Sequence, residues 1–209
     1  MRVIIALLAP ALTAAFPFAA ADQPDPNQIQ INSVSTSGSG CPRRAVSTTI
    51  SEDRTVVTLG FDEFQTYIGR RYGSADRDKN CNIRLNLKYP GGYTYAVIDA
   101  TYHGFAQLDS GVNGTLSSSY SFGDSAAAST TETNITGGGV WADGQVYTKH
   151  DAVPTEKVIR SPCGQNVNLV IRTRINLNSN DPAANGSMTD DDATIAFTQQ
   201  VHIGWQTCT

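Results

Sequence analysis

The sequence predicts an all-β protein, an antiparallel β-sandwich of about eight to ten strands stapled by two disulfides. Apolar residues alternate with polar ones at a period of two in several stretches, as in half-buried strands. Turn signals rich in Gly, Pro, Asn and Asp separate these stretches. No stretch repeats apolar residues every 3.6 positions over three helical turns.

Three segments alternate most clearly and are predicted to be strands. The apolar positions of the three segments are Ile83, Leu85, Leu87 and Tyr89; Val167, Leu169, Ile171, Ile175 and Leu177; and Ile195, Phe197, Val201, Ile203 and Trp205. Weaker strand patterns cover residues 29–35, 45–51, 55–61, 115–122 and 145–149.

The segment Tyr93 to Leu108 changes phase within itself. Tyr93, Tyr95 and Val97 share one parity, whereas Ile98, Ala100, Tyr102 and Leu108 share the other. Because an extra residue re-phases a strand, we expect a β-bulge near Asp99.

Two segments lack a strand pattern. Residues 62–72, with Phe64, Tyr67 and Ile68, are predicted to form a short helix. Residues 123–139 are rich in Gly, Ser, Ala and Thr, and Ile135 is almost their only apolar residue. We expect a mobile loop there, or at most an edge hairpin.

The N-terminus has the layout of a cleaved secretory signal. A single charge, Arg2, precedes a short apolar run, and small residues end at Ala21. Pro10 and Pro17 interrupt the run, which is shorter than the roughly 18 residues of a membrane span. We therefore predict a signal peptide over 1–21, a flexible arm over 22–28, a single domain over 29–209, and no membrane attachment after cleavage.

The four cysteines, Cys41, Cys81, Cys163 and Cys208, are widely spaced and include no CxxC pair. On an exported chain this pattern indicates two disulfides rather than a metal site or a nucleophile. Three connectivities are possible, and loop-closure entropy separates them by only about 1 kcal/mol. Topology favours Cys41 with Cys81 and Cys163 with Cys208, because each bridge then joins nearby segments and the second holds the C-terminus.

Three Asn-x-Ser/Thr sequons begin at Asn113, Asn134 and Asn185. In an exported eukaryotic chain these positions are predicted surface glycosylation sites. The alternative is chance, since a chain rich in Asn, Ser and Thr contains such triplets often.

The charge balance argues against nucleic acid as a partner. The chain has 15 Lys and Arg against 19 Asp and Glu, a net charge of -4. That sign is wrong for holding phosphate backbones.

The sequence contains no evident catalytic motif and no pattern that implies a cofactor. No GxSxG elbow is present, and His103, His150 and His202 show no zinc spacing. We interpret His103 and His202 as surface or structural residues. The acidic tract at residues 190–192 lacks the spacing of a calcium loop and is interpreted as a solvated turn.

Glycoside hydrolysis requires only two suitably placed carboxylates, for which Asp62, Glu63, Asp99 and Asp109 are the candidates. Asp62 and Glu63 are adjacent and would point to opposite faces of a strand. Asp109 precedes a Ser-Gly turn and is more simply a turn-capping residue.

Tyrosines gather between residues 89 and 102. Tyr89, Tyr93, Tyr95 and Tyr102 could form a platform on which sugar rings stack. The alternative is that they fill the core, and the shared parity of Tyr93 and Tyr95 with Val97 favours it.

The block from Lys79 to Tyr93, continuing through Asp99 to Asp109 and Gly111 to Thr115, resembles domain-of-unknown-function family 4360, largely small secreted fungal proteins. Further landmarks are Ser39-Gly40-Cys41-Pro42, Phe61-Asp62-Glu63-Phe64, Ser161-Pro162-Cys163-Gly164 and Trp205-Gln206-Thr207-Cys208. The resemblance implies a secreted, disulfide-stapled, β-rich single domain, and it carries over no catalytic residue.

A function specific to this chain would reside in its variable loops, which are predicted to hold the basic residues Arg70, Arg71, Arg77 and Lys79 and the acidic tract. The leading hypothesis is a secreted, monomeric, non-enzymatic interaction protein that acts on a host or cell-wall target. The alternatives are a carbohydrate-binding module and a cell-wall-acting hydrolase with a carboxylate pair. The expected partner is an extracellular protein or polysaccharide, outside the cell or at its wall.

Overall fold

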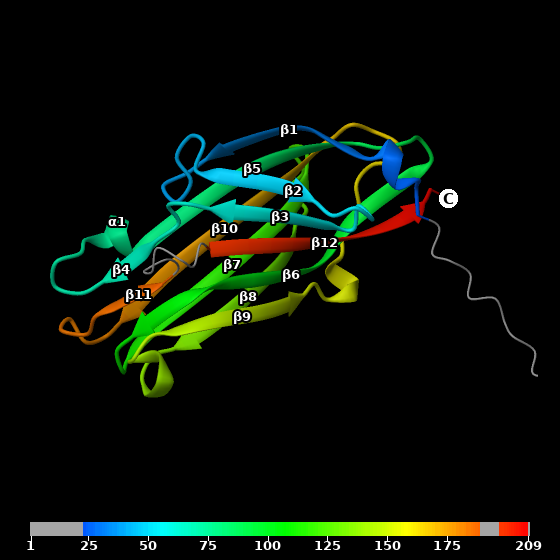
Figure 1. Ribbon diagram of the computed structural model, residues 1–209. Helices are drawn as coiled ribbons and strands as arrows, with labels where there is room; N and C mark the ends of the chain where they lie inside the picture. The colour runs from blue at the N-terminus through cyan, green and yellow to red at the C-terminus, as the bar shows by residue number, and fades with distance from the viewer. Residues whose placement is uncertain (1–22, 189–196, 209) are drawn as a thin grey trace, which may run out of the picture.

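The computed structural model describes residues 23–188 and 197–208 (Figure 1). The predicted signal peptide, the acidic tract at 190–192 and Ile195 lie outside the described residues.

Two antiparallel sheets pack face to face as a β-sandwich (Figure 1). The five-stranded sheet has the order β1 (Gln30–Ser37), β5 (Asp78–Lys88), β10 (Asn168–Ser179), β7 (Val112–Phe122), β8 (Ser129–Thr136). The seven-stranded sheet has the order β2 (Val46–Ile50), β3 (Val56–Phe61), β12 (Phe197–Thr207), β6 (Tyr93–Leu108), β11 (Gly186–Met188), β4 (Thr66–Ile68). In the same sheet, β9 (Gln145–Ala152) also pairs with β6.

This architecture confirms the predicted all-β sandwich. The described residues form twelve strands, more than the expected eight to ten. The two shortest, β4 and β11, have three residues each, too few to show a period of two.

The core lies between the two sheets and is built from the predicted alternation. Leu85 on β5, Ile175 on β10 and Val201 on β12 are fully buried, while their sequence neighbours face outward or lie at intermediate depth. Burying an aliphatic side chain of this size contributes roughly 1.5–3 kcal/mol, so these strands hold the sheets together.

The predicted bulge in β6 is confirmed. His202 pairs with Asp99 but the next residue, Ile203, pairs with Val97, which leaves Ile98 without a partner in the ladder. The side chain of Ile98 is exposed, and the inward parity changes at this point.

The prediction of a short helix over residues 62–72 is wrong. Thr66 and Ile68 are buried on β4 while Tyr67 between them is half-buried, so the local period is two. Pairing with β11 satisfies the backbone of this short segment. The chain's one described α-helix, α1, follows at Ser74–Arg77.

The segment 123–139 contains an edge strand, β8, which pairs antiparallel with β7, so the alternative of an edge hairpin is confirmed and the mobile loop is not. Ser129, Thr131 and Thr133 of β8 point inward, where hydroxyl groups replace the apolar side chains that a strand pattern requires. These hydroxyls are hydrogen-bonded; Thr133, for example, donates to the Asp151 carboxylate at 2.6 Å. A 3-10 turn, η2, follows at Gly139–Trp141.

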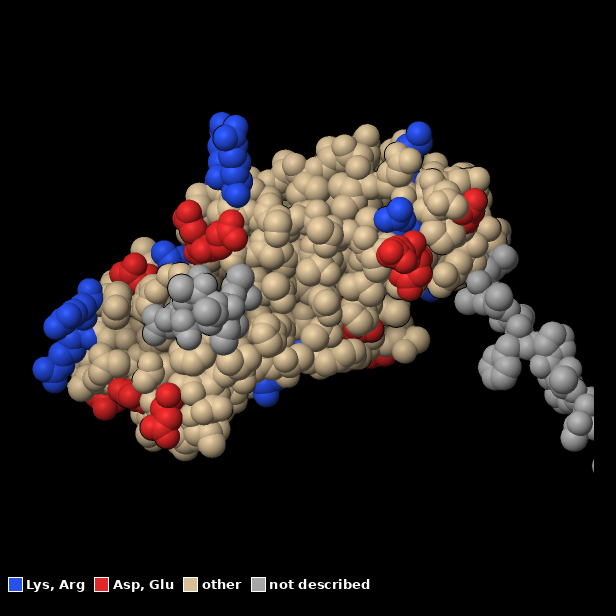
Figure 2. All heavy atoms as spheres, in the orientation of Figure 1, with Lys and Arg blue, Asp and Glu red and all other residues tan. Residues whose placement is uncertain are grey.

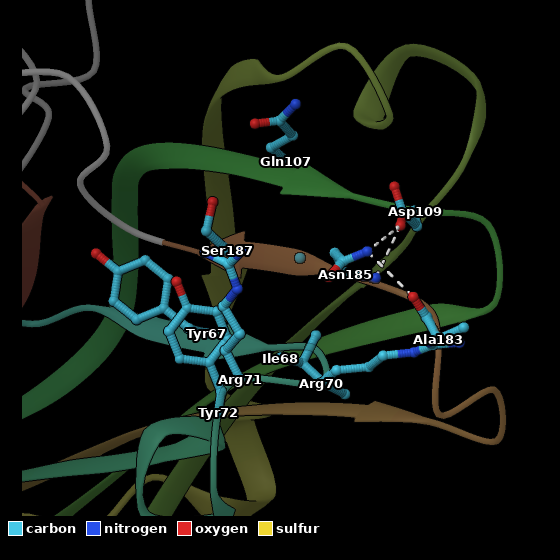
Figure 3. Close-up of a pocket in the computed structure, with 11 residues that line it drawn as sticks. Tyr67, Ile68, Arg70, Arg71, Tyr72, Gln107, Asp109, Ala183, Asn185 and Ser187 are labelled. Carbon is cyan, nitrogen blue, oxygen red and sulfur yellow. Dashed lines mark hydrogen bonds between the residues drawn. The ribbon is translucent and has the colours of Figure 1, made fainter.

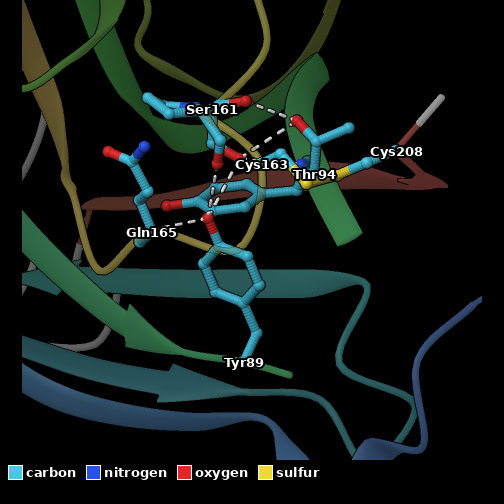
Figure 4. Close-up of a disulfide and its surroundings, with 8 residues drawn as sticks. Tyr89, Thr94, Ser161, Cys163, Gln165 and Cys208 are labelled. Carbon is cyan, nitrogen blue, oxygen red and sulfur yellow. Dashed lines mark hydrogen bonds between the residues drawn. A yellow bond between two sulfur atoms is a disulfide. The ribbon is translucent and has the colours of Figure 1, made fainter. Parts of the chain in front are cut away.

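Both predicted disulfide pairings are present. Cys41 is bonded to Cys81, and Cys163 to Cys208, with Cα separations of 5.3 and 5.9 Å. Figure 4 shows the second bridge. Beside it, the Cys208 amide donates to the Gly92 carbonyl at 2.8 Å, so the end of β12 is tied to the start of β6.

Outside the strands, two further 3-10 turns are η1 (Pro26–Gln28) and η3 (Thr155–Lys157). η1 lies in the segment expected to be a flexible arm, where the Arg54 guanidinium donates to the Pro26 carbonyl at 3.2 Å. In the described part of the chain, no helix is long and apolar enough to cross a membrane.

Candidate functional site

The tyrosines proposed as a sugar platform do not form one. Tyr89, Tyr95 and Tyr102 are buried, and Tyr93 is half-buried against the core. The hydroxyl of Tyr89 donates to the Gln165 carbonyl at 2.8 Å, beneath the Cys163–Cys208 bridge (Figure 4). Burial raises the pKa values of the Tyr95 and Tyr102 phenols. These rings fill the sandwich because Tyr89 continues the inward parity of β5 one residue past its end, while Tyr95 and Tyr102 point inward from β6.

The four candidate carboxylates are dispersed. Asp62 and Glu63 are exposed on the turn after β3. Asp99 faces outward near the middle of β6 and Asp109 lies just beyond its end, a distance of roughly 30 Å at ~3.3 Å per residue. Asp99 and Asp109 are therefore too far apart to act together on one glycosidic bond.

All three histidines lie on the outer side of the seven-stranded sheet. Oδ1 of Asp99 is 2.9 Å from Nδ1 of His202 and 3.3 Å from Nε2 of His150. Nδ1 of His103 is 3.0 Å from the Thr148 hydroxyl. Within residues 23–188 and 197–208, no group of three or more His, Cys, Asp or Glu side chains is arranged to hold a metal ion.

An open cleft of about 710 Å³ lies at the end of the molecule formed by β4, β11 and the end of β6 (Figure 3). Its described lining is Tyr67, Ile68, Arg70, Arg71, Tyr72, Gln107, Asp109, Ala183, Asn185, Gly186 and Ser187. Aromatic, amide, hydroxyl and charged groups thus share one concave surface.

The floor of the cleft is a row of side chains across three strands. Ser187 on β11 is paired with Tyr67 on β4 and with Gln107 on β6. Directly opposed residues in neighbouring strands have Cβ atoms about 4.5–5.5 Å apart and project to the same face. The register therefore brings a phenol, a hydroxyl and an amide into one line.

A tight turn places a second aromatic ring over the row. The Tyr72 amide donates to the Gly69 carbonyl at 3.1 Å, which folds the chain back after β4. The rings of Tyr67 and Tyr72 then stack, with centroids 5.1 Å apart and planes inclined by 19°. Tyr72 is 39% exposed, so part of this stacked pair faces solvent.

Gly69 allows the turn to approach the opposite wall. Its φ is +149°, a conformation that favours glycine, and a Cβ there would lie 2.5 Å from Oδ1 of Asn185. Glycine at this position therefore lets the turn carrying Tyr72 pack against the loop before β11.

Asp109 and Asn185 hold that loop in place. The Asn185 backbone amide donates to Oδ2 of Asp109 at 2.7 Å, and the Asp109 amide donates to the Asn185 carbonyl at 3.0 Å. The Asn185 side-chain amide also donates to the Ala183 carbonyl at 3.1 Å (Figure 3). This wall is held by hydrogen bonds to main-chain groups on both sides.

The predicted glycosylation sites are on the surface. Asn113 on β7 and Asn134 on β8 are exposed, and their sequons run alongside each other, with Asn113 opposite Thr136 and Thr115 opposite Asn134. Asn185 is also exposed but belongs to the cleft wall. Attachment of glycans at these positions stays a prediction.

The stacked, partly exposed tyrosines of the cleft are not among those selected from the sequence. Tyr67 and Tyr72 lie in the segment expected to be helical, and their stacking depends on a turn. Two signals pointed toward the region: the alternation of Thr66 and Ile68 around Tyr67, and the neighbouring basic pair Arg70-Arg71, which lines the cleft. Gln107, Asn185 and Ser187 are brought to this site by strand pairing alone.

The fold and site define a disulfide-bonded β-sandwich protein with an open polar and aromatic cleft at one end. The chain belongs to the family described as Domain of unknown function (DUF4360), which it matches over residues 27–208. A protein of Arthroderma benhamiae named "Uncharacterized secreted protein" is 37% identical over 186 residues, covering 89% of this chain and 74% of that protein.

Two solved structures are weakly similar. TmCBM61 in complex with β-1,4-galactotriose has a TM-score of 0.22 and 10% identity, over 86% of this chain and 91% of that one. The CBM22-1-GH10 modules of a Clostridium thermocellum endo-1,4-β-D-xylanase with xylohexaose have a TM-score of 0.23 and 11% identity, over 72% of this chain and 26% of that one. Superpositions this weak assign no ligand to this chain.

Proposed function

We propose that this protein is a secreted, non-catalytic binding protein whose cleft holds a saccharide. The observation that carries the proposal is the partly exposed Tyr67–Tyr72 stack beside the row of Ser187 and Gln107. The leading sequence hypothesis, an interaction protein of the cell exterior, and its carbohydrate-binding alternative are combined in this proposal.

Sugar recognition needs an apolar surface and hydrogen-bonding groups side by side. A pyranose ring presents C–H groups on its faces and hydroxyls around its rim, so it stacks on an aromatic face while polar side chains contact the rim. Tyr72 supplies aromatic surface, and Gln107 and Ser187 supply donors and acceptors along the same cleft.

The lining supports binding over hydrolysis. Of the described residues around the cleft, Asp109 is the single carboxylate, and its Oδ2 accepts the Asn185 amide. Hydrolysis of a glycosidic bond requires in most families two carboxyl groups, one to protonate the leaving oxygen.

An extracellular site of action is consistent with the covalent structure. Both disulfides would be reduced in the cytosol but persist in oxidising compartments. The name of the Arthroderma benhamiae relative, a secreted protein, supports the same location.

The test is a pull-down of the mature protein, expressed by secretion, on insoluble chitin, β-glucan and cellulose, followed by binding titrations with soluble oligosaccharides. We expect saturable binding to at least one glycan that is lost on heat unfolding. Tyr72→Ala should weaken it at least tenfold, and Tyr72→Trp should retain it.

The matched control is Val146→Ala, which removes an exposed apolar side chain from β9, outside the cleft. Equal binding by Tyr72→Ala and the parent protein would overturn the assignment of the cleft. Absence of binding to every glycan tested would overturn saccharide recognition itself.

A further inference from the structure

We propose that the saccharide held by this cleft is anionic, a pyranose bearing a carboxylate or sulfate group that Arg70 binds. This inference rests on the proposed function and adds the charge of the ligand. It follows from the charges of the described lining, the position of Arg70 and the charge distribution of the whole protein.

The described lining of the cleft contains more cations than anions. Arg70 and Arg71 line it together with one carboxylate, Asp109. Among the described residues, neither arginine has an acidic oxygen within 4.0 Å, whereas Arg174 is paired with Asp78 and Arg84 lies 3.9 Å from Asp124. Oδ2 of Asp109 accepts the backbone and side-chain N–H groups of Asn185, so within the described lining two arginines stand against one carboxylate that is already hydrogen-bonded.

Arg70 is placed to act together with the aromatic pair. It follows Gly69 directly, so the turn that stacks Tyr72 on Tyr67 also fixes the origin of the Arg70 side chain. In Figure 3 that side chain extends along the cleft away from the tyrosine rings, toward Ala183. A ligand whose ring packs on Tyr72 can therefore present an acidic substituent to the guanidinium at the other end.

The guanidinium group suits this task chemically. It remains protonated throughout the physiological pH range and offers N–H donors in a planar fork that matches carboxylate and sulfate oxygens. Hydrogen bonds between two charged groups are roughly twice as strong as those between neutral ones. A neutral sugar in this cleft would offer the guanidinium no charged acceptor.

The attraction is local rather than a property of the whole protein. The chain has a net charge of -4, which repels polyanions at long range. Figure 2 shows Lys and Arg at the end of the molecule where Figure 1 places α1 and β4, with Asp and Glu groups beside them, while the middle of the visible face carries little charge. Non-specific adsorption of acidic polymers along the surface is therefore disfavoured.

The experiment measures binding of galacturonate oligosaccharides, their carboxyl-reduced neutral counterparts, and sulfated galactan oligosaccharides, at low and high salt. We expect at least tenfold tighter binding of one acidic series than of the neutral series. Arg70→Gln should remove most of that preference and Arg70→Lys should recover part of it. The control, Arg84→Gln, changes the net charge equally but on the outer face of β5.

Each outcome separates the two proposals. Neutral oligosaccharides could bind as tightly as both acidic series, with Arg70→Gln leaving all three affinities unchanged. That result would overturn the proposal of an anionic ligand and leave the proposal of saccharide binding intact. Acidic binding that falls equally in Arg70→Gln and Arg84→Gln would show non-specific charge attraction and also overturn it. If none of the three series binds, and Tyr72→Ala does not change binding to any glycan, the proposed function is overturned as well.

Discussion

The backbone amide of Asn185 donates to Oδ2 of Asp109 at 2.7 Å, which ties the end of β6 to the loop before β11. The Asn185 side-chain nitrogen has two hydrogens, and it lies 3.1 Å from the Ala183 carbonyl and 3.4 Å from Oδ2 of Asp109. Both hydrogens thus have acceptors inside the cleft wall.

A glycan on Asn185 would replace one of these hydrogens and open the wall. We therefore expect that, in a host that glycosylates secreted proteins, forms modified at Asn185 bind saccharide at least tenfold more weakly than forms modified only at Asn113 or Asn134. Glycopeptide mapping combined with binding of separated glycoforms measures this. Equal affinity of all glycoforms would contradict it.

Gly69→Ala should damage the cleft. The new methyl group would meet Oδ1 of Asn185 at 2.5 Å in a backbone conformation with φ of +149°. We expect saccharide binding to fall at least tenfold. The control is Gly73→Ala, where the nearest atom to a Cβ, Oδ2 of Asp76, is 3.8 Å away. Similar losses in both variants would mean that the turn does not shape the site.

Gln199 joins a buried polar network between the two sheets. Its Oε1 accepts from the Thr173 hydroxyl at 2.8 Å, and its Nε2 donates to the Tyr120 hydroxyl at 3.1 Å. Gln199→Leu removes both hydrogen bonds, although Thr173 keeps Ser118 as a partner and Tyr120 keeps Thr131. At about 0.5–1.5 kcal/mol for each bond, the loss should cost about 1–3 kcal/mol of unfolding free energy. Chemical denaturation measures it against the exposed Gln200→Leu, which should change little.

The disulfides should contribute strongly to stability. Replacing Cys163 and Cys208 together by serine is expected to cost about 2–5 kcal/mol, since the bridge restricts the unfolded chain and holds the end of β12. Mass spectrometry of the unreduced protein should show no alkylated cysteine. A melting curve unchanged after verified reduction would contradict this prediction.

Asp78 should make stability depend on acid pH. The Arg174 guanidinium donates to its carboxylate and holds the pKa of Asp78 below the usual range. In the unfolded chain the pKa of an aspartate is about 3.9, and in the folded protein the pKa of Asp78 is lower. The ionised carboxylate therefore stabilises the folded state at pH values above the unfolded-state pKa. This contribution is lost as the pH falls through the folded-state pKa of Asp78.

Asp78→Asn should therefore lower unfolding free energy by about 0.2–1 kcal/mol near pH 7, a small effect because the pair is partly exposed. The difference from the parent should shrink below pH ~4. Denaturation curves at both pH values measure it, with Asp124→Asn as a control on an almost fully exposed carboxylate. A difference that persists at low pH would exclude the carboxylate as its cause.

The sequence by itself determined the sandwich, its main strands, the bulge beside Asp99 and both cysteine pairings. Alternation is local: Leu85 and Leu87 are buried by the same two-residue period that exposes Arg84, whatever strand lies alongside. Where hydroxyl groups replaced apolar ones, as at Thr131 on β8, that local signal failed, because their burial depends on hydrogen-bond partners from other strands.

The cleft was decided by tertiary structure. Tyr67, Ser187 and Gln107 are far apart in the sequence and come into one row only when β11 pairs with both β4 and β6. Tyr89 and Tyr72 have the same side chain, yet one is buried and the other partly exposed, because strand parity turned the first inward and a glycine turn carried the second to the surface. Non-local pairing, which no periodicity encodes, therefore selected the residues of the site.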